Sequence, residues 1–297
     1  MSSLKDYEPL FGSWYVDKEL GEGSCGKVYS VHSEGRCSAV RMISVPQSEA
    51  DLERARLEMN EHALRSYFSM FVQDIVQAID IMNALKGCNN IVSLEDHEVI
   101  QNDALHWDIL IRMELLRPLC DYSSFSAENV VKMGIDISCA LEACGEKIHV
   151  DVKPGNIFVS ERGDFKLDVF GSYCREHSCS ISRRGLYMAP EVLRGERDYG
   201  PSVNLYALGM VMYRCLNNNR LPFMPPYPEA ITPKIMDDAF MRRMKGEEML
   251  PDIPDIDPVV NAFIMKACAF KPEDRYQTAG EFRADFESVR DILNCKS

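Results

Sequence analysis

The sequence contains no apolar run long enough to cross a bilayer. Its longest apolar stretches, such as residues 205–211, are far shorter than the roughly 20 residues that a spanning helix needs. The 11 cysteines include no Cys-x-x-Cys pair, and no apolar leader precedes them. Cysteines scattered in this way indicate reduced thiols rather than a disulfide framework. We therefore expect a cytoplasmic protein that does not associate with membranes.

Clustered positive charge is also missing. The chain has 33 Lys and Arg residues against 46 Asp and Glu residues, which gives a formal net charge of −13. Such a surface repels a phosphate backbone, so we expect no nucleic acid as a partner. A hydrophobic content of 46% over 297 residues is typical of a folded chain and is sufficient for two lobes, each with its own core.

Residues 149–156 read His-Val-Asp-Val-Lys-Pro-Gly-Asn and place three candidate catalytic side chains close together in the sequence. Asp151, Lys153 and Asn156 stand at offsets of zero, two and five. A carboxylate can accept the proton of an attacking hydroxyl, a lysine can neutralise a moving phosphate, and an amide oxygen can hold a divalent cation. The Pro-Gly pair keeps the segment a loop. The spacing indicates phosphoryl transfer, and a polar turn is the alternative.

A second motif is glycine-rich. Residues 21–28 read Gly-Glu-Gly-Ser-Cys-Gly-Lys-Val, between two short strands that we expect within residues 14–31. Glycines in a G-x-G-x-x-G-x-V turn allow a backbone to approach phosphates closely. By itself this pattern is also compatible with a plain hairpin turn.

The remaining patterns predict strands in the first part of the chain and helices in the second. Strands are expected at 38–43, 90–99 and 107–115, with a helical tract at 49–86 that Ser48 caps and that divides near Arg65. A connector follows at 117–124. The predicted second part has a helix from 126 to Gly145, a hairpin at 157–159 and 165–169, a buried helix at 205–216, and helices that begin at Asp257 and Thr278.

The order of these motifs resembles that of the Ser/Thr protein kinases. It runs from the glycine-rich hairpin through an Ala-Val-basic strand and a helix to His-x-Asp-x-Lys-x-x-Asn, Val169-Phe170-Gly171 and Ala-Pro-Glu at 189–191. The resemblance covers nearly the whole chain. It implies an α+β, bilobal protein-kinase-like fold, with a small β-rich N-lobe at residues 1–116 and a larger helical C-lobe at 117–297. It also implies that Arg275 pairs with Glu191.

The resemblance assigns roles to individual residues. Asp151 is the expected proton acceptor, Lys153 the phosphate-neutralising lysine, and Asn156 a magnesium ligand. The residues expected to hold ATP are the phosphate-binding Gly21, Gly23, Gly26 and Arg41, the adenine-covering Val28 and Ala39, the gatekeeper Met113, and the hinge from Glu114 to Leu116.

The chain departs from the family pattern at several charged positions. Arg41 replaces the strand lysine, Ala78 replaces the helix glutamate that orients it, and Val169 replaces the main metal-binding aspartate. Asp74 stands one helical turn before Ala78, where it would reach a longer arginine. The further departures are Val150 for an arginine and Asn204 for an aspartate. In addition, residues 182–187 either lack two residues of the family's Gly-Thr-x-x-Tyr pattern or carry Arg183-Arg184 in place of Gly-Thr.

These departures favour a pseudokinase over a working enzyme. We expect weak ATP binding with no strong need for magnesium, and a regulatory or scaffolding role in which the charged tract at 49–65 is a candidate surface for a protein partner. The alternative is an active Ser/Thr protein kinase that transfers the γ-phosphate of ATP to protein hydroxyls with an Arg41/Asp74 pair. Whether magnesium binds stays open at this point.

Overall fold

A computed structural model describes residues 3–23, 26–122, 124–145, 151–173, 185–196, 199–246 and 250–296. The chain forms two compact units. The first comprises Met1–Cys88, Val92–Leu116 and Val169–Cys179, and the second comprises Asn89–Ile91, Arg117–Asp168 and Ser180–Ser297. The N-terminal part is rich in strands and the C-terminal part is helical, so the predicted α+β bilobal fold is confirmed. The assignment of residues 1–116 and 117–297 to two lobes stays a prediction.

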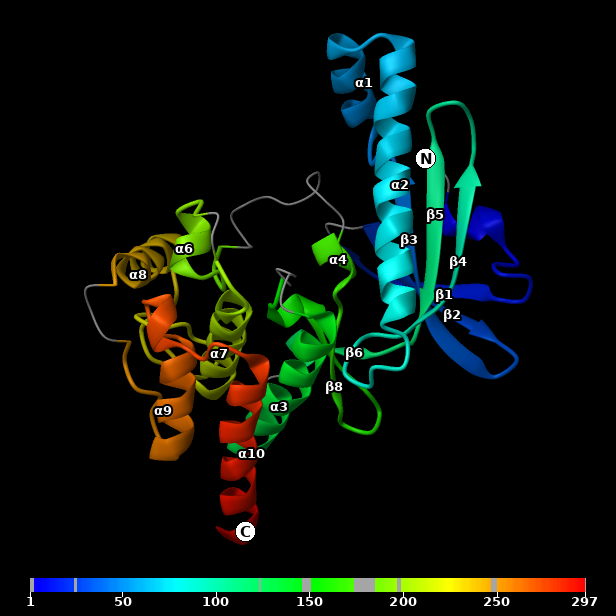
Figure 1. Cartoon of the computed structure of the whole chain (residues 1–297). Helices are drawn as coiled ribbons and strands as arrows, with labels where there is room; N and C mark the ends of the chain where they lie inside the picture. The colour runs from blue at the N-terminus through cyan, green and yellow to red at the C-terminus, as the bar shows by residue number, and fades with distance from the viewer. Residues whose placement is uncertain are drawn as a thin grey trace. The chain divides into compact units, whose positions relative to one another are not determined.

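The first unit is built on one five-stranded antiparallel sheet (Figure 1). In the order in which they pair, the strands are β1 (Tyr15–Gly23), β2 (Gly26–Ser33), β3 (Arg36–Val45), β5 (Trp107–Met113) and β4 (Leu94–Gln101). The strand predicted at 90–99 begins only at Leu94. Ile91 belongs to the second unit, where it forms an isolated parallel bridge with Leu167.

One face of this sheet is covered by the segment that precedes β1. Leu4, from the short 3-10 helix η1 (Leu4–Tyr7), packs with Leu10 and Trp14 against a set of buried strand residues. These strand residues are Val31, Val40, Met42 and Leu110. The sequence patterns did not predict this packing, because Leu4 and Leu10 lie before the first expected strand.

Two helices follow β3, as predicted, but they divide earlier than expected. Helix α1 (Glu49–Glu58) starts at Ser48, whose side chain accepts a hydrogen bond from the Asp51 amide. Helix α2 (Glu61–Ala84) starts at Asn60, whose side chain accepts from the Ala63 amide at 2.9 Å. Because Asn60 provides a new N-cap, the break lies there and not near Arg65. Helix α2 packs along β3 and β4 (Figure 1).

The second unit is mainly helical. Its longer helices are α3 (Ala127–Cys144), α7 (Ser202–Leu216), α8 (Pro233–Lys245), α9 (Pro258–Ala267) and α10 (Ala279–Lys296). Helix α7 is buried on nearly all sides, as its composition predicted, and it packs against α3 and α9. Within the described ranges, no helix combines the length and apolar character that a membrane span requires.

Shorter elements complete the two units. In the second unit, β6 (Arg117–Pro118), β7 (Ile157–Val159) and β8 (Phe165–Leu167) form a small antiparallel sheet, which contains the predicted hairpin. The remaining short helices are η2 (Leu119–Asp121), η3 (Pro154–Asn156), α4 (Phe170–Tyr173), α6 (Pro190–Leu193) and η4 (Pro272–Asp274).

The predicted helix caps of the second unit are present. Gly145 ends α3 with φ of 77°, and the Asp257 carboxylate accepts from the Val259 amide at 2.9 Å. Thr278 accepts from the Glu281 amide at 3.1 Å, whereas the Glu281 carboxylate accepts from the amide of Gln277, one residue before the expected position.

Glu191 and Arg275 form a buried ion pair, which confirms the expected contact. The guanidinium donates to both carboxylate oxygens, at 2.6 and 2.9 Å, and the two residues are only 1% and 3% exposed. Arg275 also donates to the carbonyls of Ala269 and Phe270, at 2.6 and 2.8 Å. The charge is thus compensated and the donors are satisfied, as a buried arginine requires.

We predict that breaking this pair destabilises the protein strongly. Glu191→Gln or Arg275→Met alone should lower the free energy of unfolding by about 3 kcal/mol or more, because each leaves a buried group without its partner. The measurement is urea unfolding of each variant. The control is Glu196→Gln, which removes the half-exposed ion pair with Arg194 (Nε–Oε1 2.8 Å) and should cost less than about 1 kcal/mol. Equal effects at positions 191 and 196 would contradict the prediction.

Candidate functional site

The structure brings Asp151, Lys153 and Asn156 together within the second unit. The Lys153 ammonium forms an ion pair with the Asp151 carboxylate, and both side chains are mostly shielded from solvent. The Asn156 side-chain amide donates to the Asp151 carbonyl at 2.7 Å, and the Asn156 backbone N–H donates to the Lys153 carbonyl at 2.9 Å. The loop therefore holds a carboxylate, an ammonium and an amide at one point. His149 and Val150 lie outside the described residues.

The oxygen ligands available for a metal ion come from the same loop and from the residues that follow β8. The nitrogen of the Asn156 side chain points toward Asp151, which leaves its amide oxygen on the other side. The Asp168 backbone N–H donates to the Asn156 carbonyl at 2.8 Å. The next residue, Val169, is fully buried, and its side chain has no oxygen atom. Within the described ranges, no three His, Cys, Asp or Glu side chains are placed to hold a metal ion together.

The residues predicted to cover the adenine share one face of the first unit's sheet. Strand pairing sets Val28 opposite Arg41 and Ala39 opposite Met113. Directly opposed residues share a face, and so do residues two apart in one strand, such as Ala39 and Arg41. This face is the one opposite Val40, whose side chain packs beneath the N-terminal segment. Small or apolar side chains around a flat face suit a purine ring.

The three glycines at the turn between β1 and β2 differ in whether the fold leaves space for a Cβ atom. Gly26 has φ of 95°, and a Cβ there would lie 2.1 Å from the Met42 carbonyl oxygen, so the fold itself requires glycine. A Cβ at Gly21 would meet nothing within 4 Å, and one at Gly23 would meet only the Gly26 carbonyl oxygen at 3.9 Å. Packing does not explain these two glycines, whereas close approach of a phosphate would. Ser24 and Cys25 lie outside the described residues.

The predicted hinge is fixed by contacts that the sequence did not reveal. Met113 ends β5, and the next residue, Glu114, is joined to Ser93 by two hydrogen bonds. The Glu114 N–H donates to the Ser93 carbonyl at 3.2 Å, and the Ser93 N–H donates to Glu114 Oε1 at 2.6 Å. Leu116, the last residue of this segment of the first unit, is half-buried. The backbone between Met113 and Leu116 is therefore anchored at Glu114.

Arg41 does not pair with Asp74, which corrects the expectation for these two residues. The Arg41 guanidinium carbon lies 5.1 Å from the ring centroid of Phe170, in a cation–π contact, and no ion pair joins it to Asp74 in the described part of the chain. Ala78, at the position of the family's glutamate, is buried. The arginine is thus stabilised in part by an aromatic ring.

Three buried cysteine and tyrosine side chains of the second unit are not poised for nucleophilic chemistry. Burial raises the pKa of the Cys215 and Cys268 thiols to about 12, and it also raises the pKa of Tyr187, whose hydroxyl accepts a hydrogen bond from Arg214 at 2.9 Å. The cysteines that the structure describes at positions 37, 88, 120, 139, 144, 215 and 268 are free thiols. Arg183 and Arg184 lie outside the described residues, and Asn204 is buried at the start of α7.

Comparison with known proteins identifies the family. A family model for the protein kinase domain matches residues 14–286. The chain is 25% identical over 305 aligned residues to a probable serine/threonine-protein kinase of Streptomyces coelicolor. The alignment covers 97% of this chain and 41% of that protein. It is 32% identical over 225 residues to Aurora kinase B of Danio rerio, covering 72% of this chain and 62% of that protein.

A third relative is the serine/threonine-protein kinase PknB of Mycolicibacterium smegmatis, which is 30% identical over 154 residues, or 48% of this chain and 23% of that protein. The chain thus spans less than half the length of several of the curated relatives that it matches. Because the family model matches residues 14–286 and so covers almost the whole chain, the chain belongs to the protein kinase family.

Proposed function

We propose that the chain is a degenerate protein kinase, which binds ATP weakly and acts as a regulatory or scaffolding module. The observation that carries this proposal is Val169, which is fully buried at the position of the family's metal-binding aspartate. A buried isopropyl group can neither coordinate magnesium nor carry the charge that would hold it. Ala78 adds to the case, because a buried methyl group stands where the family has the glutamate that orients the phosphate-binding lysine, and Arg41 replaces that lysine.

ATP fits the residues assigned to it, all in the first unit, better than magnesium fits Asn156 and Val169. We assign the phosphates to Gly21, Gly23, Gly26 and Arg41, and the adenine to Val28, Ala39, Met113, Glu114 and Leu116. Bound ATP would supply a γ-phosphoryl group for transfer. For magnesium, Asn156 offers one amide oxygen, while Val169 offers none. The contacts assigned to adenine and backbone do not depend on a metal ion.

The alternative function is an active Ser/Thr kinase, and the geometry of the loop favours it. Asp151, Lys153 and Asn156 are held by one another as they would be in a loop ready to orient a hydroxyl and neutralise a phosphate. The discriminating experiment is intact mass after incubation with ATP and Mg²⁺ or Mn²⁺. A gain of phosphate that disappears in Asp151→Asn would establish the active enzyme and overturn the proposal.

We predict that ATP binding is weak and persists in EDTA. At about ten times its dissociation constant, ATP should stabilise the fold by roughly 1.4 kcal/mol, which raises the melting temperature by a few degrees at most. The measurement is thermal shift with millimolar ATP, with and without Mg²⁺. Ala39→Trp, which fills the adenine face, is the control that should abolish the shift. A shift that requires Mg²⁺ would support the alternative of an active kinase. No shift with ATP, ADP or AMP would indicate a pure protein-interaction module.

We also predict that repair of catalysis requires several substitutions at once. Val169→Asp alone should remain nearly inactive, because Arg41 still lacks the family's glutamate partner. The triple variant Val169→Asp, Arg41→Lys and Ala78→Glu should gain activity on the order of a hundredfold over the single variant, which is the usual effect of one preorganised electrostatic partner. Initial rates on a generic basic protein substrate measure this. Full activity from Val169→Asp alone would show that Arg41 and Ala78 matter little.

A further inference from the structure

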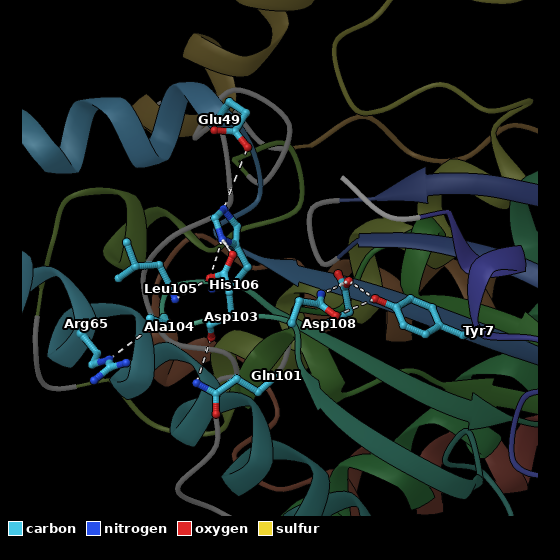
Figure 2. Close-up of polar contacts among 10 residues, drawn as sticks. Tyr7, Glu49, Arg65, Gln101, Asp103, Ala104, Leu105, His106 and Asp108 are labelled. Atoms are coloured by element: carbon cyan, nitrogen blue, oxygen red, sulfur yellow. Dashed lines mark hydrogen bonds and ion pairs between the residues drawn. The ribbon is translucent and has the colours of Figure 1, made fainter.

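The first unit contains a pocket that none of the residues assigned to adenine lines. It has a volume of about 430 Å³, which is within the range of pockets that hold small molecules or peptide side chains. It is formed where β3 ends, α1 begins and the β4–β5 turn returns to the sheet (Figure 2). Its lining residues are Ser44, Val45, Pro46, Ser48, Glu49, Asn102, Asp103, His106, Trp107 and Asp108.

The pocket contains a buried carboxylate whose charge is not paired. Asp108 is only 3% exposed, and it accepts hydrogen bonds from the Tyr7 hydroxyl at 2.6 Å, the Asn102 side-chain amide at 2.7 Å and the Ser44 hydroxyl at 2.5 Å. All three donors are neutral, and no Lys, Arg or His side chain pairs with Asp108 in the described ranges. These hydrogen bonds satisfy the carboxylate oxygens, while no cationic side chain of the described ranges stands beside the negative charge, so the pocket suits a cationic ligand.

Two more carboxylates stand at the edge of the same pocket. Figure 2 shows His106 between Asp103 and Glu49, with Nδ1 2.8 Å from an Asp103 oxygen and Nε2 3.9 Å from Glu49 Oε1. The Asp103 and Glu49 side chains are 59% and 70% exposed, so they face incoming solutes. The nearby cation Arg65 donates from Nε to the Ala104 carbonyl at 3.3 Å, on the outer side of the turn. Carboxylates therefore outnumber cationic groups around the opening.

A metal ion is not the ligand that these side chains suit. In the described part of the chain, no three acidic, histidine or cysteine side chains converge closely enough to coordinate one. The acceptors are instead spread over a pocket larger than one side chain, and Val45, Pro46 and Trp107 form apolar wall between them. A guanidinium group on an aliphatic stem matches both features, because its forked donors reach separated acceptors while the stem packs on apolar surface.

We propose that this pocket binds an arginine side chain of a protein partner, within a basic segment of that partner. The arginine head approaches Asp108, the stem lies along Val45 and Trp107, and neighbouring basic residues meet Glu49 and Asp103. The pocket adjoins the first turn of α1, the beginning of the charged tract at 49–65, so the tract and the pocket form one surface. This inference goes beyond nucleotide binding and holds whether or not the chain transfers phosphate.

The test uses the full chain and a capped pentapeptide, acetyl-Gly-Arg-Ala-Arg-Gly-amide, with the citrulline version as its neutral isostere. Titration calorimetry at physiological ionic strength compares the wild type with Glu49→Gln/Asp103→Asn, in which both side chains keep an acceptor oxygen for the turn. We expect binding of the arginine peptide to weaken about tenfold in this variant, because each of the two exposed carboxylates contributes roughly threefold to the affinity. The citrulline peptide should not bind the wild type.

The matched control is Asp17→Asn/Glu34→Gln. This control also removes two negative charges from the first unit. Asp17, like Asp103, contacts a histidine, since its Oδ1 lies 2.6 Å from His32 Nδ1. The affinity of this control variant for the peptide should stay within about twofold of the wild type. An equal loss in the control would show that the net charge of −13, and not the pocket, attracts the peptide. Equal binding of the citrulline peptide, or no binding of the arginine peptide at millimolar concentration, would also overturn the proposal. The ATP thermal shift of all variants should be unchanged, so failure here is distinct from failure of nucleotide binding.

Discussion

The buried pair of Glu191 and Arg275 is the interaction on which the helical unit depends. It joins the short helix α6 to the turn before α10, and Arg275 further binds two carbonyls after α9 and lies 4.7 Å from the Tyr206 ring of α7. One guanidinium therefore joins three segments, which are residues 269–275, helix α6 and helix α7. Because both charges are inside the protein, neither can be lost without exposing the other to an apolar interior.

The departures from the kinase pattern follow a different physical rule, because they remove charges without leaving unsatisfied partners. Ala78 and Val169 are apolar and buried, and the Arg41 guanidinium is placed over Phe170. Replacing buried charged groups by apolar ones is often neutral or favourable for stability. Catalysis, by contrast, needs preorganised charges around the phosphates. The fold and the chemistry are thus separable, which explains how a chain with an altered site keeps the kinase architecture.

The pocket beside α1 gives the charged tract a structural meaning. The sequence marked residues 49–65 as a candidate partner surface, but with no indication of the partner's chemistry. The buried Asp108 carboxylate, with Asp103 and Glu49 at the edge, supplies that chemistry. An overall charge of −13 helps a basic partner to approach, whereas the pocket determines where it is held.

The order of motifs and the local patterns by themselves determined the kinase fold, the strands around the glycine turn, the Ser48 and Asp257 caps and the Glu191–Arg275 contact. These features rest on periodicity, on capping chemistry and on motifs with a known order, all of which are written in consecutive residues. Tertiary structure alone decided that Leu4 and Trp14 cover the sheet, that Arg41 meets Phe170 instead of Asp74, and that Ser93 anchors the hinge. These contacts, and the pocket around Asp108, join residues distant in the chain. Which of several available partners a side chain reaches depends on packing geometry, and no local pattern encodes that choice.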